Sequence, residues 1–426
     1  MRIAIIGAGC SGIAAIKKFK EAGLTDITCF EQNDKVGGNW IYTSGSSHSS
    51  ITETTHIISS KKLSEYSDFP MPAEYPDYPS HAQVLQYFED YAEHFRLKPF
   101  IKFGSKVDKV LRNESGLWEI FVNQSNQAEE FDYLIISNGH HSVPRHPEIK
   151  GNFNGEYIHS HDFKSKDRFT GKRVLVIGGG NSACDCAVEC SRVAEYVAIS
   201  MRKPQYIVPK FMMGKPTDTF NDALRFVPDI IAEPLRKLSL KLQIGNYKDY
   251  GLMTPDFPIT KDHPTVNSEL LYTLRHGKVM PKTGIEKVED KRVYFTDGTS
   301  EVFDVIIAAT GYKIATPFFD SEFLDYSDAD SIPLFLRMFH PTYHNLIFIG
   351  LVQPQGSVWP LSEAQSGLAA KYIQGHWKLP TNIAELAQKE ANKISKDFLK
   401  NKRHTVEVHF TPYLETISRC QVSQRC

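Results

Sequence analysis

The sequence predicts an α/β fold in which a strand, a glycine-rich turn and a helix follow one another in the same order twice. The turn at Gly7–Gly12 (GAGCSG) comes after the apolar run Arg2–Ile6, and the turn at Gly178–Ala183 (GGGNSA) comes after Arg173–Ile177. A short apolar run before such a turn is typical of a buried parallel strand, and a helix-compatible stretch follows each turn. We therefore expect two Rossmann-like dinucleotide-binding domains.

The first of these domains is expected to have further strands at Ile27–Glu31 and Phe131–Ser137. Ser80 is the expected N-cap of an amphipathic helix between them. The apolar stripe of this helix, which we expect to face the core, contains Val84, Leu85, Phe88, Tyr91, Ala92 and Phe95.

The second domain is expected to begin near Gly171, with another strand at Glu195–Arg202. Residues 204–262 are punctuated by prolines and predict a helical insertion, which we interpret as a lid over the site. Arg292–Thr296, followed by Asp297-Gly298, predicts a hairpin, and Asp304–Ala309 and Leu346–Gly350 predict buried strands. The predicted organisation is a split first domain at 1–168 and 291–426, with the second domain inserted at 169–290.

The bulk composition is that of an ordinary globular protein, with 41% hydrophobic residues, 23% charged residues and a formal net charge of −1. This charge gives no field that favours nucleic acid, and no stretch approaches the roughly 18 apolar residues of a membrane span. The seven cysteines contain no Cys-x-x-Cys, and the sixteen histidines lack metal-ligand spacing, so we expect no metal. Gly7 and Gly9 mark the N-terminal run as a strand rather than a targeting segment. We expect a soluble, cytoplasmic protein and leave a homodimer open.

The residues at the end of each domain's second strand predict which nucleotide each turn binds. Glu31 lies about 20 residues after the first turn, where a carboxylate accepts hydrogen bonds from ribose hydroxyls and repels a 2′-phosphate. The first site therefore suits FAD or NAD. Arg202 and Lys203 lie at the matching place after the second turn, where a guanidinium can pair with a 2′-phosphate. The second site therefore suits NADP(H), and the pair of sites indicates electron transfer between a flavin and NADPH.

The segment between the turns contains Phe153-x-Gly155-x-x-x-His159-x-x-x-Phe163. This motif resembles the fingerprint of the flavin-containing monooxygenase family, the N- and S-oxidising class B flavoprotein monooxygenases. Related Baeyer–Villiger enzymes typically have Trp where this chain has Phe163. The resemblance runs from residue 1 to about 415 and is closer to soluble bacterial members than to animal members, which have a C-terminal membrane anchor. It implies that His159 and Phe163 shape the hinge between the domains.

Other parts of the chain carry the same resemblance. These segments are Gly37–Trp40, Ser59–Lys61, Tyr66–Pro70, Tyr75-Pro76, Asn267–Leu271, Ala309–Tyr312, Val352–Pro354 and Gly356–Gln365. The chain departs from the family just before the Ser-Ser-Lys segment, where many members have Asn and this chain has Ile58. Asn can hydrogen-bond a flavin peroxide and Ile cannot, so we expect leakage of NADPH oxidation to hydrogen peroxide.

The resemblance implies an order of events that uses FAD, NADP and O2. NADPH reduces FAD, NADP stays bound, and reduced flavin takes up O2 to give a C4a-hydroperoxide, which passes one oxygen to a soft N or S nucleophile such as an amine, a thioether or indole. Because this chemistry belongs to the flavin, no catalytic side chain is expected. The partners are then O2 and a small-molecule substrate.

The residues expected to bind the cofactors follow from the turns and from the resemblance. The FAD contacts are Gly7, Gly9, Ser11, Gly12, Glu31, Asn39, Trp40, His48 and Gln353. The NADP contacts are Gly178, Gly180, Ser182, Arg202 and Lys203. Further cofactor contacts are expected from Gln32, Val107 and Asn181.

Several other functions remain open at this point. A disulfide reductase would share both nucleotide sites but needs a redox cysteine pair, and neither Cys10 nor Cys29 has that spacing. A decarboxylating oxygenase of indole-pyruvate type uses the same motifs, and a Baeyer–Villiger enzyme differs at Phe163. A leaky NADPH oxidase is a further alternative. A non-catalytic sensor that binds FAD and NADP is the alternative outside enzymes.

Overall fold

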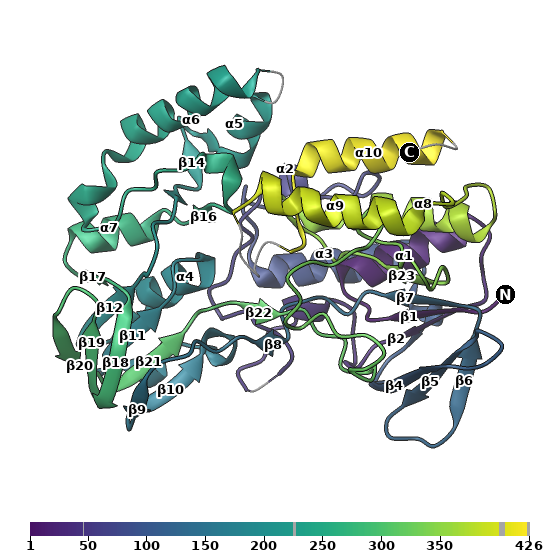
Figure 1. The fold of residues 1–426 in the computed structure, drawn as a ribbon, viewed down its shortest axis with the longest axis horizontal. Coiled ribbons are helices and arrows are strands. Elements are labelled where there is room, and N and C mark those ends of the chain that lie inside the picture. The colour runs from purple at the N-terminus through teal and green to yellow at the C-terminus, as the bar shows by residue number, and fades with distance from the viewer. Residues whose placement is uncertain (46, 225–226, 400–404, 424–426) are drawn as a thin grey trace. The chain divides into compact units, whose positions relative to one another are not determined.

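The computed structural model describes residues 1–45, 47–224, 227–399 and 405–423, and the chain forms two compact units (Figure 1). The first unit comprises Met1–Tyr42, Ser59–Val143 and Lys313–Cys426, and the second comprises Thr43–Ile58 and Pro144–Tyr312. The predicted α/β class and the insertion of one dinucleotide-binding unit into the other are therefore present. The short strands β8 (Val143–Pro144) and β22 (Tyr312–Lys313) lie where the chain passes between the units.

The extents of the units differ from the predicted segments 1–168, 169–290 and 291–426. Strand β10 (Glu156–His159) pairs in parallel with β21 (Val305–Ala308), and β21 pairs with β11 (Arg173–Ile177). Segments before 169 and after 290 therefore complete the sheet of the second unit. This pairing joins residues about 150 positions apart, and no local sequence pattern reports it.

The first unit is built on a five-stranded parallel sheet in the order β23-β7-β1-β2-β3. Its strands are β23 (Leu346–Phe348), β7 (Tyr133–Ile136), β1 (Ile3–Ile6), β2 (Ile27–Phe30) and β3 (Ile101–Lys102). All four residues of β1 are buried, as expected for a central strand covered on both faces. The strands expected near residues 27, 131 and 346 are confirmed, each one to three residues shorter than predicted.

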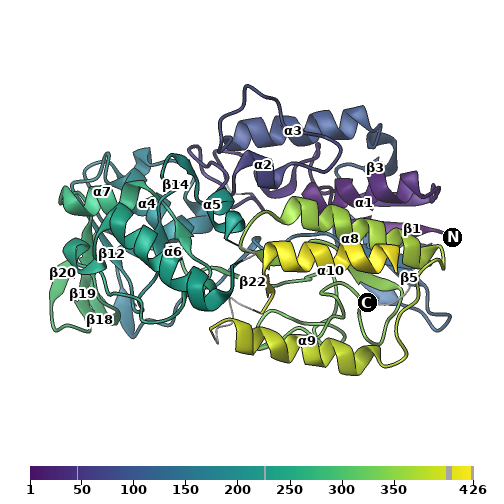
Figure 2. The ribbon, with the colours of Figure 1, turned by 90° about the horizontal axis from the view of Figure 1, so that it is seen from above.

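Helices cover this sheet. Helix α1 (Cys10–Glu21) packs against α8 (Val358–Ile373), and α8 packs against α10 (Phe410–Val422), as Figure 2 shows. Helix α3 (His81–His94) begins at the predicted cap, where the Ser80 hydroxyl accepts from the Gln83 N–H and Gln83 completes a capping box. The other parts of the unit are α2 (Lys61–Ser64), α9 (Ile383–Asp397), the antiparallel strands β4 (Val107–Arg112), β5 (Trp118–Val122) and β6 (Ala128–Phe131), and the pair β24 (Gln353–Pro354) and β25 (Glu407–Val408).

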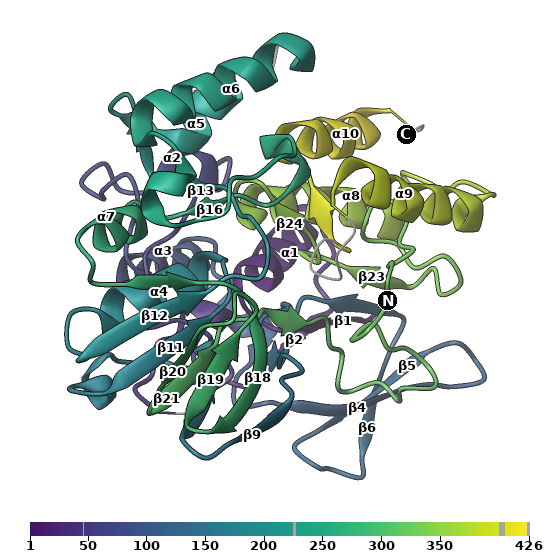
Figure 3. The same cartoon turned by 60° about the vertical axis from the view of Figure 1, so that its left-hand side comes forward.

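The second unit has its own five-stranded parallel sheet, in the order β10-β21-β11-β12-β17. Strands β12 (Tyr196–Ser200) and β17 (Met280–Lys282) complete it. Figure 3 shows the strands of this sheet side by side, and alternate residues of a strand face opposite layers. Val174 and Val176 pack towards helix α4 (Asn181–Cys190), and Leu175 packs towards a second sheet. That sheet consists of β20 (Ser300–Val302), β19 (Arg292–Phe295), β18 (Ile285–Asp290) and β9 (Gly151–Phe153), and it contains the predicted hairpin.

The stretch at 204–262 is only partly helical. It contains α5 (Thr217–Ala223) and α6 (Asp229–Ile244), together with short strands that the prolines did not predict. These are β13 (Ile207–Val208), which pairs with β16 (Thr265–Val266), and the hairpin of β14 (Phe211–Met212) and β15 (Lys215–Pro216). Helix α7 (Glu269–Arg275) follows. Short 3-10 turns lie at Gly38–Trp40, Lys98–Phe100, Ser160–Asp162, Asp167–Phe169, Tyr247–Tyr250 and Ile259–Lys261.

His159, at the end of β10, is a buried base in the second unit. Its side chain is 1% exposed, its ring packs against those of His146 and Tyr312, and its Nδ1 accepts from the His161 N–H at 3.1 Å. Burial, followed by the nearby charges of His146 and His161, lowers the pKa of His159 from 6.5 to about 4. The imidazole is therefore neutral at pH 7. Phe163 of the same motif stacks on Phe169 in the core.

We predict that the unfolding free energy of His159→Gln falls less at acid pH than that of the wild type. As the pH falls, the unfolded chain takes up this proton first, because the folded-state pKa of about 4 lies below the ordinary 6.5. The contribution of neutral His159 to the unfolding free energy is fully present above pH 6.5 and is lost as the pH falls towards 4. Between pH 7 and pH 5 the wild type should lose about 2 kcal/mol more unfolding free energy than His159→Gln. Urea titrations at both pH values measure this difference.

The exposed His276 provides the control. His276→Gln should lose the same unfolding free energy between pH 7 and pH 5 as the wild type. Equal losses for His159→Gln and the wild type would contradict the prediction.

Candidate functional site

The first glycine turn joins β1 to α1 by a close approach of backbone to backbone. Gly7 has a φ of +98°, and a Cβ there would lie 2.7 Å from the carbonyl oxygen of Ser137. A Cβ on Gly12 would lie 1.9 Å from the carbonyl oxygen of Gly7. Gly9 stands at the N-cap and has no side chain to cap the helix. The first backbone N–H groups of α1 are therefore presented to an anion at this turn.

Glu31 lies directly beside this turn. Its side chain is buried, Oε2 accepts from the N–H of Ala8 at 2.7 Å, and Oε1 accepts from the N–H of Asn33 at 2.9 Å. Because Ala8 belongs to the turn, the fold itself brings the predicted carboxylate and the predicted phosphate cradle together. Oε1 also accepts from the side-chain amide of Asn33 at 2.5 Å, so Oε2 is the oxygen that keeps a second lone pair for a ribose hydroxyl.

The turn that contains Asn39 and Trp40 packs on the first glycine turn. A Cβ on Gly38 would lie 3.0 Å from the Cα of Gly9, and the N–H of Gly37 donates to the carbonyl of Ala8. Asn39 and Trp40 are half-buried. The structure therefore gathers the two glycine segments that the sequence predicted separately.

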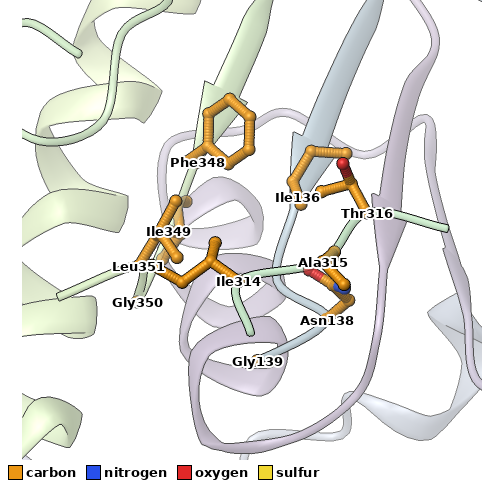
Figure 4. Close-up of a pocket in the computed structure, with 10 residues that line it drawn as sticks. All are labelled: Ile136, Asn138, Gly139, Ile314, Ala315, Thr316, Phe348, Ile349, Gly350 and Leu351. Carbon is orange, nitrogen blue, oxygen red and sulfur yellow. The ribbon is translucent and has the colours of Figure 1, made fainter. Parts of the chain in front are cut away.

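A pocket opens where the carboxyl ends of β7 and β23 meet the segment after β22 (Figure 4). It is lined by Ile136, Asn138, Gly139, Ile314, Ala315, Thr316, Phe348, Ile349, Gly350 and Leu351. Open parallel sheets bind ligands at the carboxyl ends of their strands. Nearby, the buried hydroxyls of Ser137 and Thr316 have no hydrogen-bond partner among the described residues. These orphaned groups fit a polar cofactor such as FAD.

Ser11 also reaches the end of β23. A Cβ on Gly350, which has a φ of +81°, would lie 2.0 Å from the Ser11 hydroxyl, and that hydroxyl shares a 2.9 Å hydrogen bond with Ser362 of α8. The Ser11 side chain therefore links α1 to α8. Only the backbone of Ser11 is then available to a ligand at the turn.

The remaining FAD candidates of the first unit occupy different environments. Gln32 is exposed and follows Glu31. Val107 is buried in a core cluster with Phe30, so only its backbone can contact a cofactor. Gln353 begins β24, and its Oε1 accepts from Nε2 of His140 at 3.1 Å.

The second glycine turn repeats the geometry of the first. Gly178 has a φ of +136°, and a Cβ there would lie 2.3 Å from the carbonyl oxygen of Ala309. Gly180 stands at the N-cap of α4. The Oδ1 of Asn181 accepts from the N–H of Val266 at 2.7 Å, so this side chain holds a neighbouring segment in place. Ser182 is exposed at the start of the helix.

Arg202 and Lys203 follow β12 and are exposed. Neither makes a hydrogen bond or an ion pair with any described residue, so both charges are available to a ligand. Lys203 lines a cavity of about 140 Å³. The cavity adjoins the turn, because a Cβ on Gly179 would lie 3.5 Å from Met201 and 3.6 Å from Gln205, which both line it. Its other lining residues are Pro204, Gly251, Leu252, Met253, Pro281, Lys282, Thr283 and Asp297.

His48 and Ile58 belong to segment 43–58, which packs with the second unit. The carbonyl of His48 contacts Nε2 of His161 at 3.3 Å, and the ammonium of Lys164 donates to the carbonyl of Ser49. His161 and Lys164, at the end of the Phe153–Phe163 motif, thus fix segment 43–58 by hydrogen bonds to its backbone. Sequence reasoning missed this association, because a run of 16 residues shows no motif that names its partner.

Sequence reasoning also missed Asn138, Thr316 and Gln205 as lining residues. Asn138 follows a predicted strand and could have been found from that position alone. Thr316 and Gln205 lie in irregular segments, and only the fold brings them to the two sites.

No group of three or more His, Cys, Asp or Glu in the described ranges could hold a metal ion. None of the helices described combines the length and the apolar character needed to cross a bilayer.

Comparison with known proteins agrees with this geometry. The chain matches the family model of flavin-binding monooxygenase-like proteins over residues 1–424. It is 32% identical to flavin-containing monooxygenase 5 of Rattus norvegicus and 32% identical to dimethylaniline monooxygenase [N-oxide-forming] 2 of Rattus norvegicus. Each alignment covers 98% of this chain and 82% of the relative.

Solved structures share the fold. S-allyl-L-cysteine S-oxygenase from Allium sativum superposes with a TM-score of 0.74 at 22% identity, over 98% of this chain and 88% of that chain. Cyclohexanone monooxygenase from Rhodococcus sp. Phi1 bound to NADP+ superposes with a TM-score of 0.74 at 18% identity, over 100% of this chain and 98% of that chain. The chain therefore belongs to the flavin-binding monooxygenase-like family and is an FAD- and NADPH-dependent monooxygenase.

Proposed function

We propose that this monooxygenase transfers one oxygen atom from O2 to a soft nitrogen or sulfur nucleophile of a small molecule. The observation that carries the proposal is the pair of glycine turns, one beside a carboxylate and the other followed by two unpaired cations. The N-oxide-forming relative and the S-oxygenase with the same fold support this substrate class. Phe163 supports it over Baeyer–Villiger oxidation.

The first unit is the proposed FAD site. Gly7, Gly9 and Gly12 let the pyrophosphate approach the start of α1, and Glu31 accepts from the ribose hydroxyls. The flavin ring would then lie towards Asn39, Trp40 and Gln353, with further contacts from Ser11, Gln32 and Val107. When bound, FAD supplies the redox and oxygen chemistry.

The second unit is the proposed NADP site. The turn at Gly178–Ser182 holds the pyrophosphate, and Arg202 pairs with the 2′-phosphate with Lys203 beside it. The cavity next to Gly179 is the proposed place for the adenosine end. We further propose a cytoplasmic location and leave a homodimer open.

Ile58 favours a second candidate function, an NADPH oxidase that releases hydrogen peroxide. A branched apolar side chain excludes water but offers no hydrogen bond to an oxygen intermediate. Both functions consume NADPH and O2, and they differ in where the oxygen goes.

We predict that ¹⁸O2 supplied with NADPH and a thioether or tertiary amine gives a sulfoxide or N-oxide that carries one ¹⁸O. Mass spectrometry measures the label, and a peroxide assay measures the uncoupled fraction. Hydrogen peroxide as the only oxygen product with every amine and thioether would contradict oxygen transfer and establish the oxidase. No flavin-dependent NADPH oxidation at all would favour a redox sensor.

We predict that Arg202→Ala raises the KM for NADPH by about 10- to 100-fold, because a hydrogen bond to a charged group contributes about 1.5–3 kcal/mol. The KM for NADH should change less than about threefold, since NADH has no 2′-phosphate for the guanidinium to bind. Steady-state kinetics with both nucleotides measures these values. The control is Arg292→Ala, an exposed arginine on β19 of the same unit. Equal effects of Arg202→Ala on NADPH and NADH would refute the assigned role.

A further inference from the structure

His140 and Gln353 lie close in the chain to residues that line the pocket in the first unit. His140 follows Gly139, and Gln353 comes two residues after Leu351; both Gly139 and Leu351 line the pocket (Figure 4). The pair therefore continues the two chain segments that leave the carboxyl ends of β7 and β23. It lies on the side of the sheet where such folds bind their ligands.

One end of the Gln353 amide is held. Nε2 of His140 lies 3.1 Å from Oε1 of Gln353. An amide oxygen can only accept, so the imidazole nitrogen donates. The backbone of Gln353 is fixed as well, because its N–H donates to the carbonyl of Val406 at 2.8 Å and β24 pairs with β25.

The other end of the amide is free. Nε2 of Gln353 has no hydrogen-bond partner among the described residues. Because the oxygen is already taken by His140, the group that Gln353 can offer to a ligand is a pair of N–H donors. Without the imidazole, the amide could rotate and present either end.

The protonation state of His140 supports this arrangement. Burial lowers the pKa of His140, and the hydrogen bond to Gln353 and the charge of Glu407 on β25 oppose that shift without reversing it. A neutral imidazole carries a single N–H. The contact with Oε1 assigns that hydrogen to Nε2.

We propose that His140 is a positioning residue for the flavin. By donating to Oε1 of Gln353, it turns the amide so that the N–H donors face the pocket and bind an acceptor atom on the edge of the flavin ring. This inference rests on the proposal that the first unit holds FAD. It adds to that proposal a residue that does not itself touch the cofactor.

The test compares two side chains of the same shape at position 140. His140→Gln keeps an N–H donor, and His140→Met has none. Apoprotein is titrated with FAD, flavin fluorescence gives the Kd, and the visible absorption bands report the surroundings of the ring. His140→Met should weaken FAD binding about 3- to 10-fold, the range expected for one hydrogen bond, and shift the bands. His140→Gln should stay within about twofold of the wild type. A second donor-free variant, His140→Leu, should behave as His140→Met does.

A double-mutant cycle separates positioning from general damage. Gln353→Met should weaken FAD binding, and the double variant should bind no more weakly than Gln353→Met alone, because His140 acts only through that amide. The matched control is His141→Leu, whose ring neighbours that of His140 and which should bind FAD as the wild type does.

The outcomes distinguish this inference from the proposed FAD site. A wild-type apoprotein that binds no FAD would overturn the FAD site itself. FAD binding by the wild type with additive effects in the double variant would overturn the inference and leave the site standing. So would donor-free variants that fold and bind as the wild type does, or a loss in His141→Leu equal to that in His140→Met.

Discussion

Both units depend on the same constraint, which is the close approach of two backbone segments at a glycine turn. In the first unit a Cβ on Gly12 would lie 1.9 Å from the carbonyl oxygen of Gly7, and in the second a Cβ on Gly178 would lie 2.3 Å from the carbonyl oxygen of Ala309. A contact under about 3 Å to rigid backbone cannot be relieved by rotating a side chain. Glycine at these positions therefore allows the chain to pass from the strand into the helix without a backbone clash.

Other segments of the first unit pack closely against the first turn. Gly38 lies against Gly9, Gly350 lies against Ser11, and Glu31 is tied to Ala8. Residues from two parts of the chain, 31–38 and Gly350, thus converge on one turn of six residues. The turn is a point of assembly for the unit as well as a binding element, so a substitution there should affect folding and cofactor binding together.

The parts that sequence predicted correctly are local. The apolar run of β1, the Ser80 capping box and the hairpin at 292–302 each depend on residues close together in the chain, and each is confirmed. The parts that sequence missed are non-local. The pairing of β10 with β21, the association of segment 43–58 with the second unit and the contact of His140 with Gln353 join residues from about 100 to more than 200 positions apart. Loop closure over such lengths leaves no periodic pattern, so only the assembled fold can show these partners.

The two turns share their backbone geometry, so the choice of nucleotide must depend on the charges beside them. Glu31 is buried and accepts three hydrogen bonds from the chain, so its carboxylate is fixed beside the first turn. Arg202 and Lys203 are exposed and have no partner among the described residues, so their positive charge is not compensated within the chain. A phosphate would be repelled at the first turn and attracted at the second. In the proposed assignment, a few residues after the second strand of each unit select the nucleotide, and no change in the turns themselves is required.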